Sequence, residues 1–334
     1  EGRLVSPPLK GACVASSKGR SHSSVEYPLA FPLSNNRSHC AARAGHTRCM
    51  SKQQWFRPEI LDLPAYVPGK KGGNTDVVKL SSNENPFPAL PAVQAAVSAA
   101  VGDLNRYPDM FATGLIHDIS WFHKWVDDGV VVGNGSTALI EKILQAVVTP
   151  GGEVVLPWRS FEAYPIAVQA AGGAAVKVPL NADGSHNLPG LLSAVTERTR
   201  ALLLCSPNNP TGVALKHTDL AGFLAKVPER VPVLLDEAYI DFVDMDDAVR
   251  SDELLREHPN LIVLRTFSKA YGLAGIRVGY GLGHPEMVAG LRAIGTPFGV
   301  NALAQIAASA ALHSQEEVRA RCGVIIQERR NLVA

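Results

Sequence analysis

The segment Leu261-Ile-Val-Leu-Arg-Thr-Phe-Ser-Lys269 places a lysine just beyond a run of four apolar residues. A short and wholly apolar run is typical of a strand that helices cover on both faces of a sheet. Four more such runs precede it along the chain, at residues 130–132, 154–156, 201–205 and 231–235. They alternate with longer helical patterns, which predicts an α/β fold with a mainly parallel central sheet sandwiched by helices.

Apolar residues recur at helical spacing between and after the predicted strands. One pattern spans residues 91–101, where Pro91 suits a first helical turn, and another spans residues 137–148. A third pattern lies within residues 301–312, and a more polar helix is predicted over residues 316–330. These helices are expected to cover the sheet.

A polar cluster follows each predicted strand. The clusters are residues 133–137, 157–161, 206–212, 236–239 and 265–269. Because the carboxyl ends of parallel strands open onto one crevice, these clusters are expected to meet at a single ligand site.

The composition argues against several classes of protein. The chain has 334 residues with 32 Lys and Arg against 31 Asp and Glu, so its net charge of +1 indicates no basic surface for nucleic acid. No apolar stretch approaches the ~18 residues of a membrane span. Five cysteines without a C-x-x-C pair, and no cluster with metal-ligand spacing, argue against a disulfide framework and a metal enzyme.

Residues 1–55 are expected to be a disordered or non-native extension. The first 49 residues are rich in Ser and Arg, and their only acids are Glu1 and Glu26. This composition is typical of a transit peptide, which would direct the protein to an organelle. The other interpretation is that Met50 is the true start of a cytoplasmic protein.

The turn from Gly133 to Thr137 opens a predicted helix and suits a phosphate. Backbone N–H groups at a helix N-terminus bind anions, and Ser136 and Thr137 add hydroxyl donors. The turn contains neither the Gly-Lys-Ser/Thr of a Walker loop nor G-x-G-x-x-G, which disfavours ATP and dinucleotides. A plain strand-to-helix turn is the alternative interpretation.

Lys269 is expected to be a nucleophilic amine. It follows a buried strand and precedes Arg277 by eight residues, and an amine that loses solvent near another cation has a lowered pKa. Asp236 could pair with a protonated pyridine nitrogen, and Tyr239 with Asn209 could bind a phenolic oxygen. With Arg277 on a phosphate, the set fits pyridoxal phosphate. Taken singly, Asp236 could be a helix cap, Tyr239 a core aromatic and Arg277 a surface ion pair.

Three strings resemble those of fold-type I pyridoxal-phosphate aminotransferases, specifically the histidinol-phosphate aminotransferase family. They are Ser206-Pro-Asn-Asn-Pro-Thr-Gly212, Asp236-Glu-Ala-Tyr239 and Arg265-Thr-Phe-Ser-Lys-Ala-Tyr-Gly-Leu-Ala-Gly-Ile-Arg277. Three shorter strings are also similar, namely Tyr66-Val-Pro-Gly69, Asn83-Glu-Asn-Pro86 and Arg106-Tyr-Pro-Asp109. The resemblance covers the chain from about Phe56 to its end and implies the fold-type I architecture, a large domain plus a smaller α/β domain.

The resemblance implies a catalytic role for three residues. Lys269 would carry the cofactor, pyridoxal 5'-phosphate, as a Schiff base and would act as the catalytic base. Asp236 would hold the ring nitrogen. Tyr239 would bind the phenolate together with Asn209.

It also implies further contacts with cofactor and substrate. The phosphate would be held by Ser136, Thr137, Ser268 and Arg277. Phe161 would stack on the ring face, and Tyr66 and Asn85 would contact the substrate. Tyr107 matches a tyrosine that reaches the phosphate of the neighbouring subunit, which implies a homodimer.

The resemblance divides the chain into parts. Residues 56–85 would form an N-terminal arm, residues 86–296 the large cofactor-binding domain, and residues 297–334 the start of an incomplete small domain. The family's arginine for the substrate carboxylate has no match, so Arg329 and Arg330 stay unassigned.

One internal segment departs from the family pattern. Within residues 118–128, Trp121-Phe-His-Lys-Trp125 stands where an amphipathic helix and a short loop are expected. This segment could be damaged or divergent.

The predicted reaction is transamination between an aromatic amino acid and a 2-oxo acid, 2-oxoglutarate. Dedicated histidinol-phosphate enzymes most often carry Gly-Ser-Asp-Glu, whereas this chain has Gly135-Ser-Thr-Ala138. Losing two acids beside the substrate suits an apolar aromatic better than a cationic imidazole. Residues 158–165 and 297–305 also resemble the aromatic, or phenylalanine, aminotransferase branch.

Three alternatives stay open. The chain could be a histidinol-phosphate aminotransferase of histidine biosynthesis. It could be a lyase, decarboxylase or acyl-transferring synthase with the same cofactor residues. It could also be a truncated module that binds the cofactor without catalysis.

Overall fold

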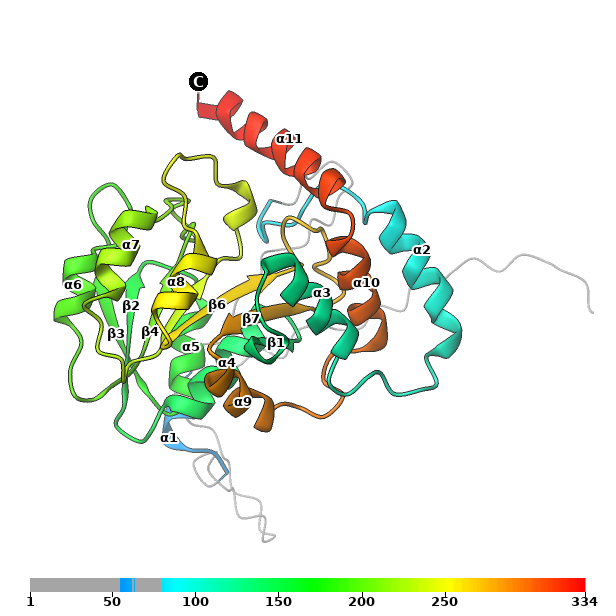
Figure 1. Cartoon of the computed structure of the whole chain (residues 1–334). Helices are drawn as coiled ribbons and strands as arrows, with labels where there is room; N and C mark the ends of the chain where they lie inside the picture. The colour runs from blue at the N-terminus through cyan, green and yellow to red at the C-terminus, as the bar shows by residue number, and fades with distance from the viewer. Residues whose placement is uncertain (1–54, 62, 64–79, 334) are drawn as a thin grey trace, which may run out of the picture. The chain divides into compact units, whose positions relative to one another are not determined.

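The computed structural model describes residues 55–61, 63 and 80–333, and these residues are built around a seven-stranded mixed sheet (Figure 1). The order of the strands is β1-β7-β6-β5-β4-β2-β3. Their bounds are β1 Val130–Gly133, β2 Glu153–Trp158, β3 Ala174–Pro179, β4 Thr199–Cys205, β5 Val233–Asp236, β6 Leu261–Thr266 and β7 Gly279–Gly283. Strands β2 to β6 pair in parallel, and β7 runs antiparallel to both of its neighbours. The predicted α/β fold is confirmed.

Two of these strands, β3 and β7, were not predicted. Strand β3 lies at the edge of the sheet and is mostly exposed, so it lacks the apolar run that marks a buried strand. Strand β7 has glycine at alternate positions, a residue depleted in strands. The structure explains the glycine at position 279, because a Cβ there would lie 2.5 Å from the backbone nitrogen of Ser136.

The sheet is covered by helices on both faces, which is why its strands are nearly continuous apolar runs. Leu203, Leu234 and Ile262 are fully buried against one group of helices, α4 Ser136–Val147, α5 Ala163–Ala170 and α9 Pro285–Ala293. Their chain neighbours Leu202 and Val233 face the opposite group, which includes α3 Thr113–His123, α7 His217–Leu224 and α8 Ser251–Glu257.

The remaining helices are α1 Pro58–Leu61, α2 Pro91–Ala100, α6 Leu188–Ser193, α10 Ala302–Leu312 and α11 Gln315–Val333, with short 3-10 turns η2 Val101–Asp103, η3 Asp127–Gly129 and η4 Ile240–Phe242. Of these helices, α2, α10 and α11 agree closely with the predicted ranges, whereas α1 and α6 were not predicted. Pro91 begins α2 as expected. Asn301 caps α10, since its Oδ1 accepts a hydrogen bond of 2.8 Å from the nitrogen of Ala304.

Residues 118–128 correct one expectation, because the structure contains a helix where the sequence suggested a divergent segment. Helix α3 continues to His123, and both His123 and Trp125 contact strand β7 of the sheet. The indole of Trp125 donates to the carbonyl of Gly283 at 3.2 Å, and Nε2 of His123 lies 2.8 Å from the hydroxyl of Tyr280. Burial lowers the pKa of His123 to about 3, so this ring is neutral.

The last helix, α11 (red in Figure 1), is tied to the loop that follows η4. Arg329 and Arg330 both contact the carboxylate of Asp244, at 2.6 and 2.7 Å. This gives the two unassigned arginines a structural contact. No helix within the described ranges is long and apolar enough to cross a membrane.

Candidate active site

The polar segments that follow the parallel strands contact one another at one edge of the sheet. The first two strands from the N-terminus, β1 and β2, deliver Asn134 and Ser160, and both contact residues that follow other strands. Nη2 of Arg277 donates to the carbonyl of Asn134 at 3.4 Å, and Ser160 donates to Oδ1 of Asn208 at 2.7 Å. The convergence expected from the sequence is therefore present.

Lys269 follows β6, and its amine is only partly exposed to solvent. Nζ donates to the carbonyls of Ser82 and Asn83, at 3.0 and 3.2 Å, and lies 5.4 Å from the centre of the Tyr239 ring. Burial lowers the pKa of Lys269; the charges of Glu84 and Asp236 oppose this shift, and that of Arg277 adds to it. A lowered pKa makes the amine a better nucleophile and proton acceptor near neutral pH.

The segment that contains Asn83 and Asn85 contacts both the amine and the main chain of Lys269. The amide of Asn85 donates to the carbonyls of Lys269 and Ala270, at 3.0 and 3.1 Å, and the amide of Asn83 donates to the hydroxyl of Tyr239 at 2.9 Å. Asn85 thus supports the main chain of Lys269, and its contact with a substrate stays a prediction. Tyr66, the other predicted substrate residue, lies outside the described residues.

Asp236 ends β5 and is buried, with 4% of its surface exposed. Oδ2 accepts a hydrogen bond of 2.8 Å from the hydroxyl of Tyr164, and Oδ1 accepts one of 3.1 Å from the nitrogen of Ala238. Burial raises the pKa of Asp236 to about 6, although both hydrogen bonds oppose the shift. This carboxylate is therefore poised to take a positive partner.

Sequence reasoning did not identify Tyr164 as a site residue. The side chain is fully buried in α5, where its ring meets the edge of Phe161 at 5.4 Å between centroids. The one available signal was its place three residues after Phe161, within residues 158–165, which resemble the aromatic aminotransferase branch.

Replacing Tyr164 by phenylalanine is expected to raise the pKa of Asp236. The hydroxyl stabilises the ionised carboxylate, and a hydrogen bond to a charged group is worth about 1.5–3 kcal/mol, which is roughly one to two pKa units. Only ionised Asp236 can hold a protonated ring nitrogen, so the acid limb of pyridoxal phosphate binding should move to higher pH by that amount. Phenylalanine keeps the ring against Phe161. Identical pH profiles of cofactor affinity in the two proteins would contradict this role.

The turn between β1 and α4 forms a cradle suited to an anion. Gly135 has a φ of +84°, which other residues rarely adopt, and a Cβ there would lie 2.5 Å from Nη2 of Arg277, so a side chain at this position would displace the guanidinium. Nη1 of Arg277 lies 3.4 Å from the hydroxyl of Ser268. Ser136 and Thr137 are the first two residues of the 12-residue helix α4. A guanidinium, hydroxyls and a helix N-terminus together suit a phosphate group.

Asn209 and Phe161 are half-buried in the loops that follow β4 and β2. Tyr107 differs from the other predicted cofactor residues, because 82% of its surface is exposed. Its ring lies against that of Phe298, with centroids 4.6 Å apart.

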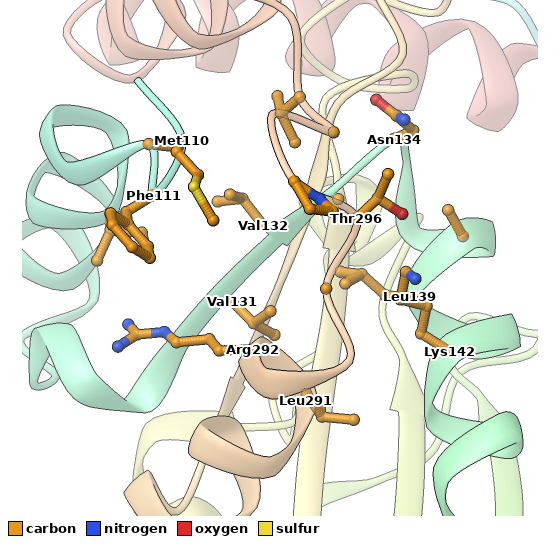
Figure 2. A pocket seen from close by; sticks show the side chains of 18 of the residues that line it. Met110, Phe111, Val131, Val132, Asn134, Leu139, Lys142, Leu291, Arg292 and Thr296 are labelled. Carbon is orange, nitrogen blue, oxygen red and sulfur yellow. The ribbon is translucent and has the colours of Figure 1, made fainter. Parts of the chain in front are cut away.

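A cavity of about 440 Å³ lies beside β1 and is lined in part by Asn134, which follows that strand (Figure 2). Its wall is mostly apolar and includes Met110, Phe111, Val131, Leu139 and Leu291, with Lys142 and Arg292 among the charged lining residues. It shares Gly133 and Asn134 with the cradle, but neither Lys269 nor Asp236 lines it. Lys269 and Asp236 therefore lie outside this cavity, at the strand ends.

Comparison with known proteins gives consistent results. A family model described as aminotransferase class I and II matches residues 75–334. The chain is 45% identical over 281 residues to an aromatic amino acid aminotransferase of Streptomyces avermitilis, covering 84% of this chain and 78% of that protein. It is 46% identical over 275 residues to an aromatic amino acid aminotransferase of Corynebacterium efficiens, covering 82% and 80%.

A solved structure is also similar. The histidinol-phosphate aminotransferase of Sinorhizobium meliloti, in complex with pyridoxal 5'-phosphate, superposes with a TM-score of 0.72 at 32% identity. The match covers 75% of this chain and 68% of that chain.

Proposed function

Because the chain belongs to the class I and II aminotransferase family, we propose that it transfers the amino group of an aromatic amino acid to 2-oxoglutarate. It is an aminotransferase, and its cofactor is pyridoxal 5'-phosphate. The observation that carries the proposal is the half-buried amine of Lys269, which interacts electrostatically with both Asp236 and Arg277.

The residues present fit this cofactor. Its phosphate matches the cradle, where Gly135 leaves room beside Arg277, and its ring nitrogen matches the buried carboxylate of Asp236. The hydroxyl of Tyr239 and the amide of Asn209 suit its ring oxygen. When bound, pyridoxal phosphate supplies a carbonyl carbon that takes up the amino group and a ring that accepts negative charge.

We assign the proton transfer to Lys269. Its Nζ atom, with a pKa lowered by burial, would accept the proton from the substrate Cα and would pass it to the cofactor carbon that takes up the amino group. Asp236 keeps a proton on the ring nitrogen through its negative charge. Ser268 and Arg277 would hold the phosphate and so would limit the movement of the cofactor in the site.

The choice of an aromatic substrate rests on two supports. Two relatives with at least 45% identity are named aromatic amino acid aminotransferases. Thr137 and Ala138 also provide no carboxylate for a cationic imidazole ring. The similar structure from Sinorhizobium meliloti supports the second candidate, histidinol phosphate.

A comparison of the two donors tests the proposal. The purified protein, loaded with pyridoxal phosphate, is given 2-oxoglutarate with either phenylalanine or histidinol phosphate, and both products are quantified. We expect phenylpyruvate and glutamate in equal amounts, with kcat/KM at least about tenfold higher for phenylalanine, as expected where an unpaired polar group is rejected. A preference for histidinol phosphate would overturn the substrate assignment. Release of CO₂, or consumption of phenylalanine without glutamate, would overturn aminotransfer itself.

We also propose that the protein works as a homodimer in which Tyr107 enters the partner's site. Tyr107 lies with exposed Phe111 and Phe298 close to the apolar cavity, and exposed apolar patches of this kind mark interfaces.

Mixing two inactive variants tests this arrangement. Tyr107→Ala and Lys269→Ala are expected to be impaired separately and to recover activity when their subunits exchange, because one site of the mixed dimer then has both native residues. At equal amounts, about a quarter of the sites would be native if subunits pair at random in a two-fold dimer. A monomer by ultracentrifugation, or no recovery after exchange, would exclude the arrangement.

A further inference from the structure

The buried amide of Asn208 lies between two residues that the proposed function assigns to the cofactor. Asn208 is 2% exposed and precedes Asn209 in the loop after β4. Its Oδ1 accepts the hydroxyl of Ser160 at 2.7 Å, and its Nδ2 donates to the carbonyl of Arg159 at 3.2 Å. Since Ser160 is followed by Phe161, one amide joins the base of Phe161 to the base of Asn209.

Further hydrogen bonds fix this amide in its own loop. Nδ2 also donates to the hydroxyl of Thr211 at 3.0 Å, and that hydroxyl donates to the carbonyl of Gly184 at 3.0 Å. The backbone nitrogen of Gly212 donates to the carbonyl of Asn208 at 2.7 Å. An asparagine amide has two N–H donors, so both are used and the side chain has one defined orientation.

The side chain of His186 lies near that of Asn208 and is also buried, with 6% of its surface exposed. Burial lowers its pKa to about 4, so the ring is neutral at pH 7. Neither ring nitrogen has a hydrogen-bond partner among the residues that the structure describes. Little water reaches this region, and a hydrogen bond lost there is poorly replaced by solvent.

We propose that Asn208 is a positioning residue that sets Phe161 relative to Asn209, and with them the slot for the cofactor ring. This inference rests on the proposed function, in which Phe161 covers the ring face and Asn209 binds its oxygen. The two residues belong to separate loops, after the paired strands β2 and β4. A link between the loops reduces their freedom before the ring binds, so less ordering free energy is lost on binding.

A matched pair of serine variants tests the inference. Ser160 and Ser206 are both 1% exposed, and each makes one hydroxyl hydrogen bond to this loop. Ser160 contacts the Asn208 amide, whereas Ser206 accepts from the nitrogen of Leu215 at 2.9 Å. Ser160→Ala is expected to weaken pyridoxal phosphate affinity about tenfold, the value of one buried hydrogen bond. It should also change the visible circular dichroism of the bound cofactor.

Ser206→Ala is expected to lower the melting temperature to a similar degree and to leave affinity and dichroism as in the native protein. Thr211→Val and Asn208→Ala extend the series, with the larger loss of affinity in Asn208→Ala; should that variant not fold, the Ser160 and Thr211 variants decide. Equal cofactor affinities and spectra in the Ser160 and Ser206 variants would overturn the positioning role. A native protein that does not take up pyridoxal phosphate would instead overturn the proposed function.

Discussion

Replacing Lys269 by alanine is expected to abolish both turnover and covalent attachment of the cofactor. The amine is half-buried, and the carbonyls of Ser82 and Asn83 hold it beside Tyr239. Loss of a positioned proton-transfer group costs about 10²- to 10⁴-fold in rate, and loss of the covalent link adds to this. Single-turnover rates with phenylalanine, and peptide mass after borohydride reduction, measure the two effects separately.

Two further variants separate the amine from its charge. Lys269→Arg keeps a cation that is never deprotonated at neutral pH, so it should be as inactive as the alanine variant despite retaining positive charge. Lys226→Ala removes an exposed lysine and should leave rate and attachment unchanged. A cofactor still trapped on the chain in Lys269→Ala would show that another amine carries it.

The ends of the strands could be predicted because an apolar run and the polar residues that follow it are local features of the sequence. Lys269 and Asp236 were both located in this way, and their electrostatic interaction agrees with convergence at one edge. The strand β7 was not predicted, because glycine is depleted in strands, and only the structure shows that Gly279 is in close contact with the turn before α4.

The hydrogen bonds that orient the site residues could not be predicted, because they join residues far apart in the sequence. Tyr164 and Asp236 are 72 residues apart, and Ser160 and Asn208 are 48 apart. No periodicity links such pairs, and a buried tyrosine has the same pattern as an ordinary core residue. The motif Asn83-Glu-Asn-Pro86 was visible, but only the structure shows its two asparagines bonded to Tyr239 and to the carbonyl of Lys269.

Replacing Asp236 by asparagine is expected to lower turnover by about 10²- to 10⁴-fold, because breaking a buried charge pair costs about 3–5 kcal/mol. Without a bound cation, burial holds the pKa of this carboxyl at about 6. A protonated ring nitrogen beside it favours the ionised form and lowers that pKa, and by the same linkage the carboxylate raises the pKa of the ring nitrogen. Asparagine keeps the shape and loses the charge, so the proton leaves the ring and the ring accepts electrons less well.

Asp241→Asn is a control for the loss of a second carboxylate, one that is half-buried. Burial also raises the pKa of Asp241, but the charge that opposes the shift there is Arg265, a residue outside the proposed cofactor contacts. Its turnover should stay within a few-fold of the native rate. The Asp236 variant should also bind 1-methyl-pyridoxal phosphate, whose ring nitrogen is permanently charged, and regain part of its rate with it, because that analogue needs no carboxylate to keep its charge. A variant at position 236 that turns over at the native rate, or gains nothing from the analogue, would show that the ring nitrogen has a different partner.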